Sequence, residues 1–168
     1  MADGADIQAI VETLGLLPHP EGGHFAEIWR ADESIAAAHL PDRYGGARSF
    51  GTAIYYLLGP GDISAMHRIT SDEIFHFYLG DPVEQLQLYP DGSHRVVEIG
   101  PDLAAGQRPQ VIVERGVWQG ARVKPGGRYA LMGTTVAPGF DFADFELIGD
   151  TDLKAGWPDA AEMIGALS

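Results

Sequence analysis

The sequence GDISAMHRITSDEIFHFYLG, residues 61–80, carries the most chemical information in the chain. His67 and Glu73 lie near its middle, and His76 follows Glu73 by three positions. The apolar residues on both sides of the polar turn predict a strand, a short turn and a second strand. Residues i and i+2 of a strand face the same way, so the position that would pair with His67 on one face is Ile69.

The rest of the chain repeats this pattern of short apolar runs separated by Gly, Pro and Asp. Turn sequences such as Pro90–Gly92 and Pro125–Gly127 separate runs that recur roughly every ten residues. The predicted strands are HFAEIWR, TAIYYLL, EIFHFYL, VEQLQLY, SHRVVEIG, PQVIVER, ARVKPGG, RYALMGTTV and GFDFADFELI. No internal repeat is present, and the spacing predicts an all-β sandwich or barrel rather than alternating strands and helices.

Two of these runs also predict their surroundings. TAIYYLL is apolar on both faces, so we expect the core on one side and a helix or a second subunit on the other. VEQLQLY alternates, which places Gln85 and Gln87 on the face opposite its leucines. That face is expected to meet solvent or a polar cavity.

Helical patterns are confined to the two ends of the chain. Apolar residues at helical spacing predict an N-terminal helix over about residues 6–17, and the segment 150–168 predicts a short amphipathic helix. The β region then covers about residues 23–149. With 168 residues in total, the chain is expected to form a single domain.

The amino-acid composition limits the binding partners and the cellular compartment that can be expected. The chain has 24 acidic and 11 basic side chains and a formal charge of −13, which argues against nucleic acid and anionic membranes as partners. No apolar stretch reaches the roughly 18 residues of a membrane span, and no export signal is evident, so a soluble cytoplasmic protein is expected. With no cysteine, any metal would be held by His, carboxylate or amide oxygen.

The residues quoted first resemble a known motif. In the first motif of the cupin superfamily a Gly precedes the His by six positions and a second Gly follows the Glu by seven, as around His67 and Glu73. The chain also resembles a largely uncharacterised cupin subfamily with an N-terminal HPEGG segment, here residues 19–23, followed by an Arg, here Arg30. The similarity continues through TAIYYLL, GVWQGA and GTTVAPGFDFADFEL, and therefore covers nearly the whole chain.

This resemblance implies a double-stranded β-helix, a jelly roll of two antiparallel sheets with one open mouth, usually assembled as a homodimer. Of the four positions that bind metal in metal-dependent cupins, His67 and Glu73 match, whereas Ile69 is not a ligand and Gln119 replaces a His. We therefore expect no cofactor. A divalent metal stays an alternative, and its ligands would be His67, Glu73 and His76.

The predicted site combines a catalytic pair with a set of ligand-binding residues. His67 is expected to act as a base and Glu73 to orient it, the alternative being a structural polar pair between two strands. The predicted ligand-binding residues are His76, Gln119, Tyr55, Tyr78, Arg30, Glu27, Trp118 and Phe140.

Each group of predicted binding residues has a chemical reason and a structural alternative. The Gln119 amide would hydrogen-bond a heterocycle or sugar, or else cap a turn. Glu27 and Arg30 would close the mouth and bind an anionic group. Phe140 would line the mouth or belong to the core. The glycines of the HPEGG segment are explained by a turn or a close strand crossing.

Three classes of function fit this inventory. The first is a metal-free isomerase or epimerase acting on a small polar, sugar-like or nucleotide-like molecule, with a phenol or amide that stabilises an enolate. The second is a non-catalytic module that binds or senses a metabolite. The third is a metal-dependent lyase or oxygenase. The superfamily hosts all three, so the fold alone does not choose between them.

Overall fold

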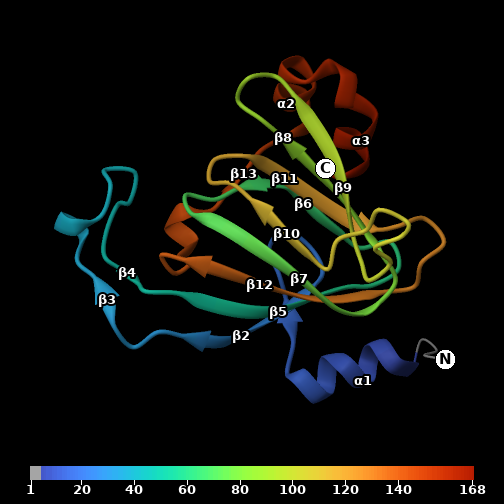
Figure 1. Cartoon of the computed structure of the whole chain (residues 1–168), viewed down its shortest axis with the longest axis horizontal. Helices are drawn as coiled ribbons and strands as arrows, with labels where there is room; N and C mark the ends of the chain where they lie inside the picture. Colours follow the sequence, from blue (N-terminus) through green and yellow to red (C-terminus); the bar gives the residue numbers. More distant parts are fainter. Residues whose placement is uncertain (1–4) are drawn as a thin grey trace.

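The structure is a computed structural model that describes residues 5–168 (Figure 1). Its elements, in chain order, are α1 (Ala5–Leu14), β1 (Leu17–Pro18), β2 (His24–Arg30), β3 (Ser34–Ile35), η1 (Ala37–His39), β4 (Arg48–Ser49), β5 (Thr52–Leu58), β6 (Ile63–Arg68), β7 (Asp72–Gly80), β8 (Val83–Leu88), β9 (His94–Ile99), β10 (Gln110–Val113), β11 (Trp118–Val123), β12 (Ala130–Ala137), η2 (Phe142–Asp144), β13 (Glu146–Leu147), α2 (Asp150–Gly156), η3 (Pro158–Ala160) and α3 (Ala161–Ala166).

Two antiparallel sheets form the body of the molecule. One has the strand order β1-β2-β5-β12-β7-β10 and the other β13-β6-β11-β8-β9, with neighbours in both running antiparallel. Several neighbouring strands are far apart in sequence, as β5 and β12 pair over seven residues although many elements lie between them. The predicted all-β jelly roll is confirmed.

The main core lies between the two sheets, where β5, β7 and β12 face β8 and β11. Its largest fully buried members include Tyr56, Phe75 and Met132. The other face of β5 places Leu57 against α1, together with Leu131. TAIYYLL is therefore covered on both faces along part of its length, as its composition predicted.

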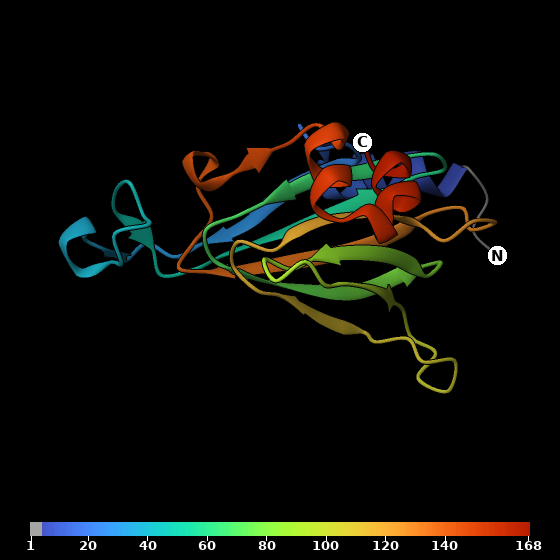
Figure 2. The same cartoon turned by 90° about the horizontal axis from the view of Figure 1, so that it is seen from above.

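The C-terminal segment covers the outer face of the five-stranded sheet (Figures 1 and 2). It forms two short helices, α2 and α3, where the sequence predicted one. Leu86 and Leu88 of β8 pack against Ile164 and Leu167 in this second core. The opposite face of β8 therefore points between the sheets, and its glutamines are fully buried instead of meeting solvent.

The N-terminal helix, predicted over about residues 6–17, spans Ala5–Leu14, because Gly15 adopts a left-handed φ of 62° and the chain then enters β1. The predicted strand GFDFADFELI contains a 3-10 turn, η2, because the Asp141 side chain accepts a hydrogen bond from Ala143 N. Only Glu146–Leu147 of this run pair as a strand.

The short hairpin of β3 and β4 and the turn η1 project from the body as a separate arm (Figure 2). No helix within residues 5–168 is long and apolar enough to cross a membrane.

The HPEGG segment is the turn between β1 and β2 of the six-stranded sheet, and it crosses over β6 of the other sheet at very close range. The Glu21 carbonyl accepts a hydrogen bond of 2.8 Å from Ala65 N of β6. Gly22 next to it has φ 111°, and a Cβ placed there would lie 2.0 Å from the Ile63 carbonyl oxygen. Only glycine fits this position, and the crossing fixes the Glu21 side chain beside β6.

We predict that Gly22→Ala destabilises the fold because the new Cβ meets backbone that cannot move aside. The matched control is Gly92→Ala, since Gly92 also has a positive φ but open space around it. Gly22→Ala should lower the free energy of unfolding by about 2 kcal/mol more than the control does. Urea unfolding of both variants measures the difference, and equal losses would contradict the close crossing.

Candidate active site

A cavity of about 240 Å³ lies between the two sheets beneath the segment 138–145. Its inner end holds ionisable side chains, and its outer end holds aromatic rings and an ion pair. The lining residues are His19, Glu21, Phe25, Glu27, Arg30, Thr52, Ile54, Tyr56, His67, Ile69, Glu73, Phe75, Thr134, Val136, Phe140, Asp141, Phe142 and Phe145.

His67 of β6 has a fixed orientation in this cavity. Its Nδ1 lies 2.7 Å from the carbonyl oxygen of Ala65, and its Nε2 lies 3.2 Å from Oε2 of Glu21. A carbonyl oxygen can only accept, so Nδ1 must carry the hydrogen. Nε2 is therefore the nitrogen that exchanges protons with the cavity.

Glu21 and His67 share a single proton. Because Nδ1 already holds the ring hydrogen, the contact between Nε2 and Oε2 needs one more hydrogen on either atom. Burial raises the pKa of Glu21 and lowers the pKa of His67, since removal from water disfavours both charged forms. These directions favour the neutral pair, in which the Glu21 carboxyl donates to Nε2.

The neighbours of Glu21 hold its carboxyl group in place. Ser64 Oγ donates to Oε1 over 2.8 Å, and the Glu21 backbone N–H donates to Nδ1 of His19 over 3.2 Å. In neutral His19 the ring hydrogen is therefore on Nε2, and burial lowers the pKa of this ring. Tyr56 closes the same wall, and its hydroxyl donates to the Gly22 carbonyl over 2.8 Å.

Glu73 of β7 is a second buried carboxyl group in the cavity. Its Oε2 accepts a hydrogen bond of 2.7 Å from Nε2 of Gln119. Burial raises the pKa of Glu73, while His67 and hydrogen bonds from Thr134 and Gln119 oppose this rise. The interaction of Glu73 with His67 is electrostatic, because the hydrogen bonds of His67 go to Ala65 and Glu21.

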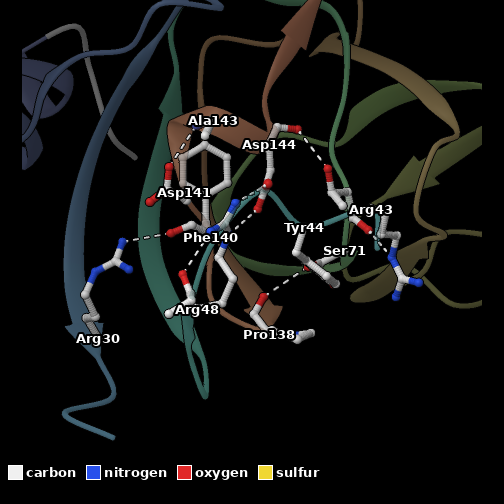
Figure 3. Close-up of polar contacts among 12 residues, drawn as sticks. Arg30, Arg43, Tyr44, Arg48, Ser71, Pro138, Phe140, Asp141, Ala143 and Asp144 are labelled. Atoms are coloured by element: carbon white, nitrogen blue, oxygen red, sulfur yellow. Dashed lines mark hydrogen bonds and ion pairs between the residues drawn. The ribbon is translucent and has the colours of Figure 1, made fainter. Parts of the chain in front are cut away.

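The outer end of the cavity is closed by the segment that follows β12 (Figure 3). Arg30 forms two hydrogen bonds to Glu27, of 2.9 and 2.8 Å, and a third of 2.9 Å to the Phe140 carbonyl. Arg48 holds the far end of the segment through two hydrogen bonds to Asp144, of 2.7 and 2.6 Å. Glu27, Arg30 and Phe140 thus lie at the mouth, where the sequence predicted them.

Five predicted binding residues do not line the cavity, and four of them lie on the outer face of a sheet. His76 lies on the opposite face of β7 from Glu73, where its Nε2 contacts Thr135 Oγ1 at 2.7 Å. Tyr55 and Tyr78 also lie on that outer face and form an edge-to-face pair. Trp118 packs in the second core instead, with the Arg68 guanidinium 4.4 Å from the centre of its ring. The reason is the same throughout, because successive side chains of a strand alternate between its two faces.

Gln119 lies behind the cavity wall rather than on it. It is fully buried and reaches the cavity only through Glu73. The Gln119 amide therefore acts on Glu73 instead of contacting a ligand directly.

The three residues named as ligands of an alternative metal site do not point toward one place. His67 and Glu73 face the cavity, but His76 points away from it. The Glu73 oxygen nearest Gln119 is already an acceptor, and Ile69 contributes only apolar surface. Within residues 5–168, no group of three His, Cys, Asp or Glu side chains is placed to hold a metal ion. These residues do not fit the metal set of the resemblance.

His19 and Glu21 line the cavity, and the sequence analysis assigned neither of them to the site. The HPEGG segment was singled out, but its glycines were explained as turn chemistry and its two ionisable side chains received no role. The signal was present, since His and Glu two positions apart in a tight turn present both side chains to one place.

Several known proteins are similar to this chain over most of its length. It is similar to protein SO0799 from Shewanella oneidensis, with 32% identity, a TM-score of 0.86 and coverage of 100% of this chain and 98% of that one. A hypothetical protein from Leishmania major has 28% identity and a TM-score of 0.86, covering 96% and 97% of the two chains. The uncharacterised protein YML079W of Saccharomyces cerevisiae is 28% identical, covering 95% of this chain and 85% of the yeast protein.

The family comparison agrees with the architecture and the motif spacing. The model described as "Cupin superfamily (DUF985)" matches residues 8–148, most of the chain. The chain therefore belongs to this family of the cupin superfamily.

Proposed function

We propose that this cupin binds a small polar metabolite in the cavity and transfers a proton on it without a metal, as an isomerase or epimerase does. The observation that carries the proposal is the 3.2 Å contact between Nε2 of His67 and Oε2 of Glu21 in the cavity, with Nδ1 of His67 engaged by the Ala65 carbonyl. Acid and base groups matched in this way are typical of proton transfer next to a carbonyl group.

The proposed reaction uses both members of the pair. A substrate carbonyl oxygen accepts the Glu21 hydrogen, which frees Nε2 of His67. Nε2 then removes the hydrogen from the adjacent carbon, the electron pair of that C–H bond forms an enol, and the Glu21 proton completes its O–H group. The products are an imidazolium and a carboxylate side by side, which stabilise each other.

The second half of the reaction returns the proton. If the original carbon carries a hydroxyl group, His67 delivers the proton to the former carbonyl carbon while that hydroxyl returns its proton to Glu21, and the result is an isomerisation. If Glu73 instead delivers a proton to the original carbon from its own wall of the cavity, the enol O–H returns its proton to Glu21 and the carbonyl re-forms with inversion at that carbon. His67 then releases its proton to solvent and Glu73 regains one. The raised pKa of Glu73 supports this role, because it extends the pH range over which the carboxyl group holds a proton that it can donate.

The dimensions and lining of the cavity indicate the size of the ligand. A volume of about 240 Å³ lies below the range of roughly 300–1,000 Å³ of drug-sized pockets. The inner end offers hydrogen-bonding groups, and Phe25, Phe140, Phe142 and Phe145 offer an apolar or flat surface at the outer end. A sugar-like or nucleoside-like molecule with a carbonyl group fits this division.

We also propose that the chain forms a homodimer through the outer face of the six-stranded sheet. Trp29, Tyr78 and Ile112 expose 51%, 46% and 54% of their surface from strands of this sheet. Exposed apolar side chains gathered on one sheet face are typical of an interface. The helix α1 covers only the part of this face around Leu57.

The reaction predicts a specific exchange of hydrogen with solvent. Incubated in D₂O with a panel of aldoses, ketoses and nucleoside-linked sugars, the protein should replace a C–H hydrogen next to a carbonyl, seen by proton NMR. His67→Ala should slow this exchange by about 100-fold or more, because the base is removed. His76→Ala is the control and should exchange at the wild-type rate, because His76 lies outside the cavity.

Two results would contradict this function. A loss smaller than about tenfold in His67→Ala would remove His67 from the proton transfer. Near-stoichiometric metal in protein purified without chelator, lost in His67→Ala, would support metal-dependent chemistry. Ligand-induced stabilisation without exchange would instead support a binding or sensing module.

The raised pKa of Glu73 predicts how stability depends on pH. The folded state holds the Glu73 proton above the ordinary carboxyl pKa of 4.5, where the unfolded chain has lost it. Stability contributed by this group is therefore present at low pH and falls as pH rises through the raised pKa. Glu73→Gln cannot titrate, so it should gain stability relative to wild type over this range, by up to about 1.4 kcal/mol per pH unit.

Urea unfolding between pH 4.5 and pH 8 measures this difference. Glu162→Gln, at an exposed position of α3, is the control for the loss of one formal charge. Parallel curves for wild type and Glu73→Gln would show that Glu73 ionises as it does in the unfolded chain.

The dimer proposal is tested by a charge on the exposed sheet face. By size exclusion with light scattering, wild type should have twice the chain mass of 18.0 kDa, and Ile112→Lys should have the mass of one chain. The matched control is Val96→Lys, because Val96 is similarly exposed, at 51%, but belongs to the five-stranded sheet. A wild-type monomer, or a dimer lost only in the control, would contradict the interface.

A further inference from the structure

Three glutamines form a continuous buried chain between the surface and the cavity. Gln85 and Gln87 of β8 have no exposed surface, and Gln119 of β11 is 1% exposed. The proposed reaction does not use Gln85 or Gln87. Apolar side chains at these positions could be buried without any hydrogen-bond partner. The presence of three adjacent buried amides therefore needs a physical explanation.

The hydrogen bonds among the three glutamines all run in one direction. Nε2 of Gln87 donates to Oε1 of Gln85 over 2.8 Å, and Nε2 of Gln85 donates to Oε1 of Gln119 over 3.3 Å. Nε2 of Gln119 then donates to Oε2 of Glu73 over 2.7 Å. Each amide offers its oxygen toward the surface and its nitrogen toward the cavity.

Groups with a fixed hydrogen-bonding role set this direction at the outer end. Nε of Arg95 lies 2.9 Å from Oε1 of Gln87, and a guanidinium can only donate. The Ile112 carbonyl lies 3.4 Å from Nε2 of Gln87 and can only accept. The hydroxyl of Tyr89 donates to the same Oε1 over 2.8 Å. Gln87 therefore has one orientation, and each following amide must adopt the matching one.

We infer that Arg95 and Tyr89 act as remote positioning residues, which fix through Gln87, Gln85 and Gln119 the direction in which hydrogen is donated to Glu73. The inner amide consequently presents a donor to Glu73 and favours its carboxylate form. If the three amides pointed the opposite way, Gln119 would present its Oε1 to Glu73 and would favour the protonated form of the Glu73 carboxyl group. This inference rests on the hydrogen-bond geometry and holds whether or not the cavity catalyses a reaction.

The direction can be reversed by one nearly isosteric change. In Gln87→Glu the side chain keeps both acceptor contacts with Arg95 and Tyr89 but has no hydrogen to donate to Gln85. Gln85 must then turn its Nε2 toward position 87, and Gln119 must turn its Nε2 toward Gln85. Glu73 would face an acceptor and should keep its proton to higher pH.

Two NMR measurements read this change without any substrate. In wild type the side-chain amide protons of Gln119 should show NOEs to the side chain of Glu73, and in Gln87→Glu they should show NOEs to Gln85. In protein labelled with ¹³C at the glutamate carboxyl carbons, the Glu73 signal, assigned by its absence in Glu73→Gln, should titrate about one pH unit higher in Gln87→Glu than in wild type.

Two further variants separate the relay from simpler effects. The double variant Gln85→Met/Gln87→Glu keeps the new charge but interrupts the chain, so the Glu73 titration should return toward the wild-type pH. The surface double variant Tyr89→Phe/Arg95→Met removes both outer donors without changing a buried amide, and should shift the titration in the same direction by a smaller amount. It also serves as the test if a buried variant does not fold.

The inference is overturned by either of two outcomes. Unchanged NOEs and an unchanged Glu73 titration in folded Gln87→Glu, or in the surface variant if Gln87→Glu is unfolded, would show that the amides are not coupled. An equal rise in the interrupted double variant would assign the effect to charge alone. Because these measurements use no substrate, they stay decisive if the hydrogen-exchange test of the proposed function fails.

Discussion

The interior of this protein depends on one constraint, that every polar group buried between the two sheets must be hydrogen-bonded. An unpaired buried amide or carboxyl group costs about 1–3 kcal/mol, a large fraction of the stability of a domain of this size. Among the described residues, every deeply buried side-chain nitrogen and oxygen has a partner. That condition explains why polar residues occur in two connected groups, one around Glu21 and His67 and the other leading to Glu73, rather than singly.

The same constraint connects the fold to its chemistry. The close crossing at Gly22 fixes the backbone of Glu21 against Ala65, and the Ala65 carbonyl also accepts the hydrogen of His67 Nδ1. One short stretch of β6 therefore fixes both partners of the shared proton. Because the cavity is buried, each group of the pair would be costly as an isolated ion, and sharing one proton avoids that cost. A pair held close to the balance between its neutral and ionic forms is suited to proton transfer.

The sequence predicted much of the fold because strand alternation and turn residues act locally. TAIYYLL became β5 at the expected bounds, and His67, Glu73, Glu27, Arg30 and Phe140 lie in or at the cavity. What could not be predicted depends on contacts between distant segments. Glu21 reaches His67 only because the turn between β1 and β2 packs against β6 of the other sheet, and the buried glutamines find their partners only across β8 and β11. The alternation of side chains along β7 separates Glu73 from His76, so the two predicted site residues could not both face the cavity, and the structure places Glu73 there.

The two departures from the metal-binding pattern have a common physical explanation. Gln119 already donates to one oxygen of Glu73, and a metal at His67 would need the Nε2 that now contacts Glu21. Gln119 and Glu21 thus provide a donor and a carboxyl group where a cation would otherwise balance the charge. Ile69 adds apolar surface beside them, which strengthens electrostatic interactions by excluding water. The site is therefore consistent with a set of hydrogen-bonded acids and bases. Each residue that differs from the metal-binding pattern depends on the other residues of this set.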